Sequence, residues 1–148
     1  MLSNTIDQEI KKAMLAKDQA QLRGLRAIKA ALLLAKTEKG PAEEITEEAE
    51  VKIIQKLIKQ RRESSDIYKG QGRADLAQVE DEEIEVISRF LPKQLDRTEV
   101  ETVIAGIVSQ TGATSVKDMG KVIGLANKEL AGKADGKLIA EVVKAQLA

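Results

Sequence analysis

The sequence predicts an all-α protein, and two observations support that class. Ala, Leu, Ile, Glu and Lys dominate the composition, and apolar residues recur at spacings of three and four along most of the chain. One Phe, one Tyr and no Trp mean that the core has to be aliphatic. We expect an N-terminal four-helix region over residues 1–92, followed by a small three-helix tail domain over residues 93–148.

Missing residue types exclude several kinds of chemistry. The 148 residues contain no Cys and no His, which excludes disulfides, thiolate nucleophiles, zinc–thiolate sites, imidazole ligands and Ser-His-Asp triads. The formal net charge is zero, so any binding of nucleic acid has to rest on local patches. No apolar run approaches the length of a membrane span and the N-terminus lacks a signal-peptide layout. We therefore expect a cytoplasmic protein with no membrane partner.

Two helices are predicted at the start of the chain. Ser3 is expected to cap the first, and Asp18 to start the second, which runs over residues 19–39. Gly40-Pro41 is expected to end the second helix, because glycine suits a left-handed cap and proline cannot continue a helix. The expected inward residues are Ile6, Ile10, Ala13 and Met14 in the first helix, and Leu22, Leu25, Ile28, Leu32 and Ala35 in the second.

A third helix is predicted from the region of Thr46 to the break at Gly70-Gln71-Gly72. Thr46 is a plausible N-cap because acidic residues follow it at the positive end of the helix. The expected inner face consists of Val51, Ile54, Leu57 and Ile58.

A basic stretch near the end of this third helix has two interpretations. Arg61, Arg62 and Tyr68 can hold a phosphate and stack a base, which would make the two arginines a secondary nucleic-acid patch. Alternatively, the arginines pair with the acid-rich helix that follows, and this structural interpretation is favoured.

A fourth helix is predicted from near Arg73 to Phe90, where Leu91-Pro92 stops it and marks the domain boundary. The acidic run Glu80–Glu83 resembles a set of metal ligands, but consecutive helical residues point in different directions. A solvated face is therefore expected. The inward residues are predicted to be Leu76, Val79, Ile84, Ile87 and Phe90.

The tail begins with two further helices. Asp96, with Glu99 three residues later, opens the first, and Gly112 closes it; Ser115 caps the second, with Asp118 in its first turn. The predicted apolar stripes are Val100, Val103, Ile104, Ile107 and Val108 in the first helix, and Val116, Met119, Ile123, Ala126 and Leu130 in the second.

Glycines and lysines alternate along this second tail helix. Lys117, Lys121 and Lys128 share a stripe with Gly124, although a glycine inside a helix costs about 1 kcal/mol against alanine. In one interpretation Gly120 and Gly124 let a neighbouring helix approach closely. In the other, bare backbone beside a row of lysines lets a phosphodiester chain come close. The two interpretations are compatible.

The last helix follows the turn Gly132–Lys137 and is expected to be capped by Asp135, with Leu138, Ile139, Val142 and Val143 facing inward. Lys133 and Lys137 in this turn stand at a helix N-terminus, where a phosphate can dock. A short capped turn explains the same residues equally well.

Four separated motifs together resemble the YqeY family over essentially the whole chain. They are K-Q-R-R at residues 59–62, R-F-L-P-K-Q-L at residues 89–95, K-D-M-G-K-V-I-G at residues 117–124 and G-K-A-D-G-K-L at residues 132–138. The C-terminal part also resembles the tail domain of the B subunit of the tRNA-dependent Asp/Glu amidotransferase.

The resemblance implies an all-α, two-part protein whose tail corresponds to a tRNA-contacting appendage. It also implies carbon–nitrogen ligase activity with glutamine as amide donor. The chain shows no Gly-rich phosphate loop and no converging acid cluster, so no catalytic residue, metal or cofactor is assigned.

Three functional hypotheses follow. In the first, the chain is a tRNA-related accessory protein whose tail touches RNA and whose partners are tRNA, the amidotransferase or another tRNA enzyme. In the second, it is a helical protein-interaction module without RNA binding or catalysis. In the third, it is a catalyst or an obligate component in amide transfer. The candidate RNA-binding residues are Lys117, Lys121, Gly124, Lys128, Lys133 and Lys137, with Arg61 and Arg62 as the secondary patch.

Overall fold

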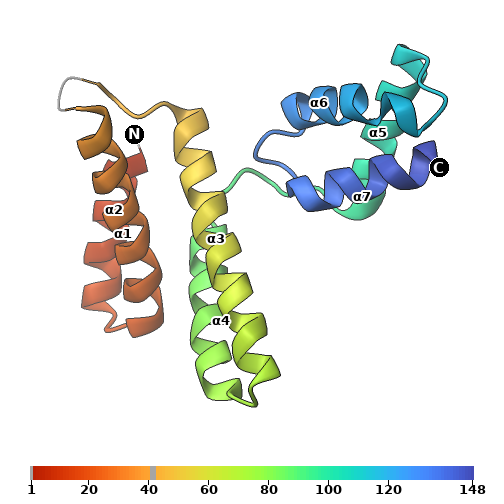
Figure 1. The fold of residues 1–148 in the computed structure, drawn as a ribbon. Coiled ribbons are helices and arrows are strands. Elements are labelled where there is room, and N and C mark those ends of the chain that lie inside the picture. Colours follow the sequence, from red (N-terminus) through yellow and green to blue (C-terminus); the bar gives the residue numbers. More distant parts are fainter. Residues whose placement is uncertain (1, 41–42) are drawn as a thin grey trace. The chain divides into compact units, whose positions relative to one another are not determined.

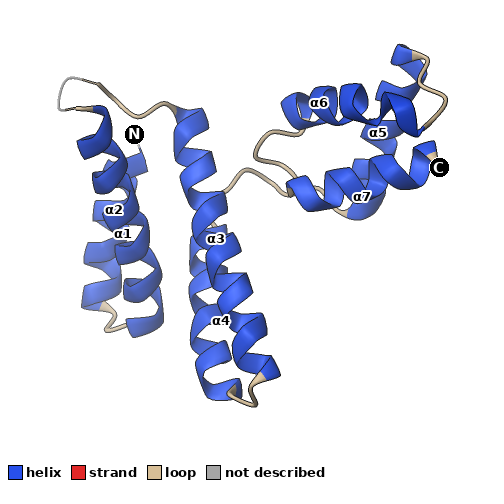
Figure 2. Ribbon diagram, in the orientation of Figure 1, coloured by secondary structure: helices blue, strands red, loops and turns tan. Residues whose placement is uncertain are grey.

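The computed structural model describes residues 2–40 and 43–148, and within these ranges the regular secondary structure is entirely helical (Figure 2). The all-α class is therefore confirmed. The chain divides into two compact units, Met1–Leu91 and Pro92–Ala148, which we call the N-terminal unit and the C-terminal unit. Each unit has an aliphatic core of its own.

The N-terminal unit consists of two helical hairpins. α1 (Leu2–Leu15) pairs with α2 (Gln19–Lys39), α3 (Glu47–Gly70) pairs with α4 (Ala74–Ser88), and α2 also packs against α4 (Figure 1). Apolar residues at spacings of three and four place one face of each helix in a common core. The buried members of that core are Ile6, Ala13, Leu22, Leu25, Ile28, Leu32, Ile54, Ile58, Val86 and Ile87.

Two predicted caps of this unit are confirmed. The side chain of Asp18 accepts a hydrogen bond from the backbone N–H of Gln21 (3.1 Å), and the hydroxyl of Thr46 accepts one from Ala49 (3.1 Å). Each cap satisfies one of the backbone donors that the first turn of a helix leaves free. The starts of α2 and α3 are thus fixed by local chemistry that the sequence reveals.

The other predicted helix ends in this unit had different outcomes. Ser3 is not a cap, because α1 already includes Leu2 and Ser3 lies within the first turn. Gly40 ends α2 with a positive φ of 100° and donates its N–H to the carbonyl of Lys36 (3.0 Å). The predicted contribution of Pro41 lies outside the described residues.

Two residues predicted to face inward are exposed instead. Met14 is 56% exposed because it lies in the last turn of α1, and Val79 of α4 is 37% exposed. Small residues fill the contact between α3 and α4: Ala77 and Ser65 are both 1% exposed. The spacing of large apolar residues did not identify Ala77 as a core residue, because alanine is common on both the buried and the exposed faces of helices.

One glycine of the N-terminal unit is required by packing. A Cβ added to Gly24 of α2 would lie 2.8 Å from Cγ1 and 2.9 Å from Cβ of Val86 on α4. Carbon atoms in contact normally lie about 3.5–4.0 Å apart, so a side chain at position 24 would force α2 and α4 apart. Sequence reasoning did not single out this residue.

The C-terminal unit contains α5 (Arg97–Thr111), the short 3₁₀ turn η1 (Val116–Asp118), α6 (Met119–Glu129) and α7 (Gly136–Leu147). The three α-helices pack against one another around a single core (Figure 1). Its buried members are Val100, Ile104, Ile107, Val122, Ala126, Leu130, Ala134, Ile139, Val142, Val143 and Leu147.

The predicted turn residues of this unit are found at the helix ends. Asp96 caps α5 by accepting from the N–H of Glu99 (2.8 Å), and Gly112 closes α5 in the left-handed conformation with φ 68°. Asp135 caps α7, as expected.

The start of α6 differs from the prediction. Ser115 caps η1, so α6 begins only at Met119, three residues after Val116. Val116 is consequently 52% exposed, whereas Val122, which the predicted stripe omitted, is fully buried. The 3₁₀ turn shifts the phase of the helix, and spacing alone does not reveal that shift.

Candidate nucleic-acid interface

The outer face of α6 is formed by residues that point away from the core of the C-terminal unit. At about 100° per residue, Lys121 and Lys128 point in nearly the same direction, and Gly124 lies close to them. Val122 and Ala126, on the opposite side, are fully buried. Leu125 also belongs to the outer face and is 40% exposed. This face therefore carries lysines, bare backbone and one leucine.

The predicted lysines are exposed and have no partner of opposite charge within the described part of the chain. The ion pairs found in the C-terminal unit all involve Arg97, which contacts Glu101 (3.0 Å) and Glu141 (3.7 Å). Five ammonium groups thus remain available to an external anion. They belong to Lys117, Lys121, Lys128, Lys133 and Lys137.

The glycines of α6 do not serve helix packing within this unit. A Cβ added to Gly120 or Gly124 would meet no described atom within 4 Å. The interpretation that these glycines let a neighbouring helix of the tail approach closely is therefore wrong. A helix-interior glycine is less stable than alanine by about 1 kcal/mol, so two exposed glycines lower helix stability without a packing gain in the unit.

Lys117 does not share the helical phase of the other lysines. It lies in η1, before α6 begins, so the predicted stripe of Lys117, Lys121 and Lys128 does not form one continuous helical row. Its backbone N–H donates to the hydroxyl of Ser115 (3.3 Å). The side chain remains exposed beside the first turn of α6.

The N-terminus of α7 is already occupied by a carboxylate. Asp135 accepts a hydrogen bond from the N–H of Lys137 (3.2 Å). An anionic ligand at this helix end would compete with that carboxylate for the same donors. The lysine side chains are therefore better candidates for contact with phosphate than the helix end itself.

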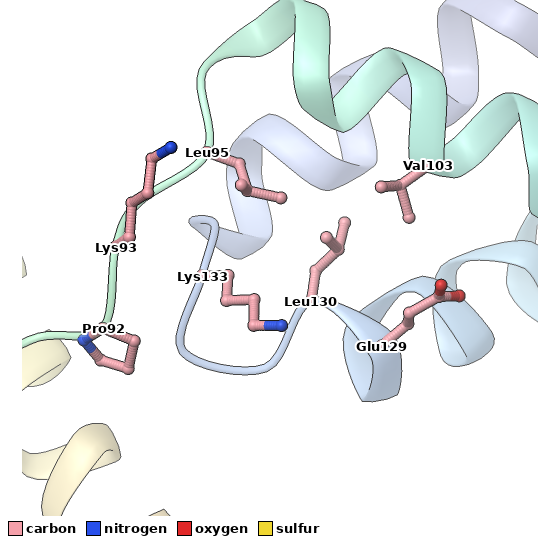
Figure 3. Close-up of a pocket in the computed structure, with 7 residues that line it drawn as sticks. All are labelled: Pro92, Lys93, Leu95, Val103, Glu129, Leu130 and Lys133. Carbon is pink, nitrogen blue, oxygen red and sulfur yellow. The ribbon is translucent and has the colours of Figure 1, made fainter.

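A pocket of about 310 Å³ lies in the C-terminal unit, between the segment before α5, α5 itself and the end of α6 (Figure 3). Leu95, Val103 and Leu130 point toward one another inside it, although they come from three different segments. The remaining lining residues are Pro92, Lys93, Glu129 and Lys133.

Hydrogen bonds hold one wall of this pocket in place. The N–H of Leu95 donates to the carbonyl of Lys133 (2.9 Å), and the side chain of Gln94 donates to the carbonyls of Gly132 (2.6 Å) and Pro92 (2.9 Å). The segment before α5 is thus tied to the turn before α7. Sequence reasoning noticed Gln94 only as part of a resemblance motif, and nothing in its spacing indicates that it crosses to Gly132.

The two arginines of the secondary patch have different surroundings. Arg61 is largely buried, lies 3.6 Å from Glu83 and donates to the carbonyl of Leu57 (3.2 Å). Arg62 is exposed and forms no ion pair among the described residues. The structural interpretation thus holds for Arg61, and only Arg62 of the two has a free guanidinium.

The acidic run of α4 is only in part the solvated face that was expected, because Asp81 and Glu82 remain partly exposed but also pair with neighbouring helices. Glu82 pairs with Arg23 of α2 (2.8 Å), and Asp81 accepts from the hydroxyl of Ser65 (2.7 Å) and lies 3.4 Å from Lys69. These acids therefore connect α4 to α2 and α3. Within the described residues, no three acidic side chains gather in a way that could hold a metal ion.

Two neighbours in this run have pKa values shifted in opposite directions. The hydrogen bond from Ser65, helped by Lys69, lowers the pKa of Asp81. Burial, together with the charge of Glu83, raises the pKa of Glu80. These shifts follow from helix packing in the N-terminal unit.

Comparison with known proteins identifies related sequences. The family model described as Yqey-like protein matches residues 3–147. A protein of Meyerozyma guilliermondii called "Altered inheritance of mitochondria protein 41, mitochondrial" is 34% identical over 88 residues, which cover 60% of this chain and 45% of that protein. A protein of the same name from Clavispora lusitaniae is 30% identical over 90 residues, 61% of this chain and 51% of that protein.

The chain thus spans about half the length of the curated relatives it matches. Their names place those two proteins in mitochondria, so the comparison gives no support for a cytoplasmic location, which stays a prediction. Among the described residues, no helix combines the length and the apolar character needed to cross a membrane.

Proposed function

The chain belongs to the Yqey-like protein family, and from that premise we propose that it is a tRNA-related accessory protein whose C-terminal unit contacts the RNA backbone. The contact residues are the lysines of η1, α6 and the turn into α7, with Gly124 providing bare backbone between them. They are Lys117, Lys121, Lys128, Lys133 and Lys137.

One observation carries this proposal: exposed lysines without ion pairs surround exposed glycines without packing contacts. Unpaired ammonium groups retain their full attraction for phosphate, because no internal carboxylate has to be displaced first. The missing side chain at Gly124 lets a bulky backbone approach α6 between Lys121 and Lys128, and Gly120 leaves the first turn of the helix bare as well. Phosphate contacts of this kind position RNA without reading its sequence.

Salt dependence provides the main test, because the whole chain has a formal net charge of zero. Binding through a local lysine patch releases counterions from the RNA and weakens as salt rises. We would titrate the purified full-length protein with unfractionated tRNA at two salt concentrations. The test variant carries Lys117→Ala, Lys121→Ala and Lys137→Ala.

The matched control removes the same charge elsewhere. Lys11, Lys36 and Lys56 are exposed and form no ion pair among the described residues, so their triple alanine variant also loses three positive charges. We expect the tail variant to bind more weakly and to lower the salt slope by about three, and the control to change little. Equal losses in both variants, or no loss in either, would reject the proposed interface.

A second candidate function is favoured by Leu125. This leucine is 40% exposed on the lysine face, where an RNA backbone gives it no apolar partner. A protein helix lying on Gly120 and Gly124 would cover it. We therefore compare Leu125→Ser with the lysine variant: loss of a protein partner from nuclease-treated lysate, with tRNA binding retained, would favour an interaction module.

Amide transfer is tested separately. The family resemblance is the basis for that activity, and the candidate interface includes no catalytic residue. Glutamine- and ATP-dependent amidation by the purified chain would support it. Absence of turnover with the amidotransferase subunits present would end it.

A further inference from the structure

The pocket of the C-terminal unit has a size and a lining that suit one small planar group. Its volume of about 310 Å³ is at the lower end of the range for small-ligand sites. Leu95, Val103 and Leu130 provide an aliphatic interior, as Figure 3 shows. Nucleobases can be held between apolar side chains as well as on aromatic rings.

The rim of this pocket carries charges of both signs. Lys93 and Lys133 offer ammonium groups, Glu129 offers a carboxylate, and none of the three forms an ion pair within the described residues. A nucleotide can use both signs, because its phosphate is anionic and most bases carry an amino group that donates hydrogen bonds.

The pocket also adjoins the candidate interface. Lys133 lines the pocket and belongs to the proposed set of phosphate-contacting lysines. The hydrogen bonds from Leu95 to Lys133 and from Gln94 to Gly132 join the segment before α5 to the turn before α7. This wall of the pocket is therefore formed before a ligand binds. An RNA strand that follows the lysines would thus pass a preformed apolar pocket.

We propose that this pocket binds one unpaired nucleotide of the RNA, with the base among Leu95, Val103 and Leu130 and the phosphate at Lys133. This inference rests on the proposed RNA contact and adds a site that selects unstacked bases. Glu129 accepts hydrogen bonds and donates none when ionised, so it suits the amino groups of cytosine, adenine and guanine. Uracil offers only its ring N3–H, which lies between two carbonyl oxygens that repel a carboxylate, and is therefore expected to bind more weakly.

Nucleoside monophosphates provide a direct test. In the full-length protein with ¹³C-labelled Leu and Val methyl groups, CMP is expected to shift the signals of Leu95, Val103 and Leu130. UMP should bind about fivefold more weakly, the ratio that one net hydrogen bond supplies. Ribose 5-phosphate lacks the base and N-acetyl-leucinamide lacks the phosphate, so these two probes separate the contributions.

Two variants test the pocket itself. Val103→Phe fills the interior and should abolish the CMP-induced shifts; its circular dichroism shows whether the fold is retained. Glu129→Gln changes an exposed residue and leaves the fold intact, and its amide serves either base, so the preference for CMP over UMP should fall to about one. Glu38→Gln is the matched control and should keep the preference, because Glu38 is exposed on α2 and, like Glu129, forms no ion pair among the described residues.

The outcomes separate this inference from the proposed function. Salt-dependent tRNA binding without CMP-induced methyl shifts would overturn the pocket site and leave the lysine interface standing. Methyl shifts without tRNA binding would support the pocket and reject the interface. If N-acetyl-leucinamide causes shifts equal to those of CMP, the pocket binds an apolar side chain of a protein. If only ribose 5-phosphate causes shifts, the response reflects general attraction of anions to the surface. Either result would overturn the proposal.

Discussion

The two units of this chain place helical glycines in contrasting surroundings. In the N-terminal unit, Gly24 lies against Val86, whereas Gly120 and Gly124 of the C-terminal unit contact nothing within 4 Å of an added Cβ. Charge does not separate the units in this way, because exposed lysines without an ion pair among the described residues occur in both, for example Lys11 and Lys56 in the N-terminal unit and the five lysines of the candidate interface.

This difference teaches where function is to be sought in an all-helical chain with few distinctive residues. A residue that satisfies a packing or pairing requirement is explained by the fold. A helical glycine that lowers helix stability without a packing gain needs another explanation, and a ligand supplies one. By that criterion the C-terminal unit is the better candidate for binding.

The largest expected effect tests whether the two cores are independent. Ile28 and Ile104 are fully buried, one in each core, and replacing either by alanine should cost about 2–5 kcal/mol of unfolding free energy. Amide hydrogen exchange should show the loss of protection confined to the unit that carries the change. Equal loss in both units after either substitution would mean that they unfold as one.

The next effect tests the packing glycine. Gly24→Ala introduces a methyl group 2.8 Å from a side-chain carbon of Val86, and valine is a stiff neighbour because its χ1 is restricted. We expect destabilisation of about 1–3 kcal/mol in urea unfolding. In a protein that already carries Val86→Ala, adding Gly24→Ala should lower the free energy of unfolding by less than it does in the unchanged protein. A neutral result for Gly24→Ala would show that α2 and α4 separate at little cost.

The glycines of α6 should respond with the opposite sign. Gly120→Ala and Gly124→Ala place a methyl group in open space and remove the entropic cost of glycine. Gly124 lies inside α6, so its replacement should stabilise the C-terminal unit by about 1 kcal/mol, and Gly120, in the first turn, should give a smaller gain. Thermal unfolding of each single variant measures this gain. If the bare backbone serves RNA approach, the stabilised Gly124→Ala variant should bind tRNA more weakly than the unchanged protein. If either variant is destabilised instead, the added methyl group must meet an atom that the structure of the C-terminal unit does not place near it.

Sequence reasoning predicted local features better than contacts between distant residues. The caps at Asp18, Thr46, Asp96 and Asp135 were predictable because cap and partner lie two or three residues apart. Contacts between distant segments, such as Gln94 with Gly132, leave no periodic signal in a single sequence.

The candidate site illustrates the same limit. Spacing identified the lysines and glycines of α6, but it could not distinguish a packing glycine from an exposed one, because that depends on whether another helix lies opposite. It therefore left packing as one of two interpretations for Gly120 and Gly124 and did not single out Gly24. It also treated residues 116–130 as one helix, and the 3₁₀ turn η1 placed Val116 outside the core in place of Val122.

The smallest expected effect concerns the paired charges of the N-terminal unit and appears as a change in how stability depends on pH. The pKa of Asp81 is lowered from its ordinary value of 3.8, first by the hydrogen bond from Ser65, so the folded state binds the proton less tightly than the unfolded chain. The resulting stabilisation is present above the unfolded pKa and is lost as the pH falls through the folded pKa. Ser65→Ala should therefore unfold more easily at pH 7 and lose less stability between pH 7 and about pH 3 than the unchanged protein. Ser109→Ala, on the exposed side of α5, should leave that pH profile unchanged. An unaltered profile in Ser65→Ala would mean that Lys69, which lies 3.4 Å from Asp81, is sufficient to hold the carboxylate in its ionised form.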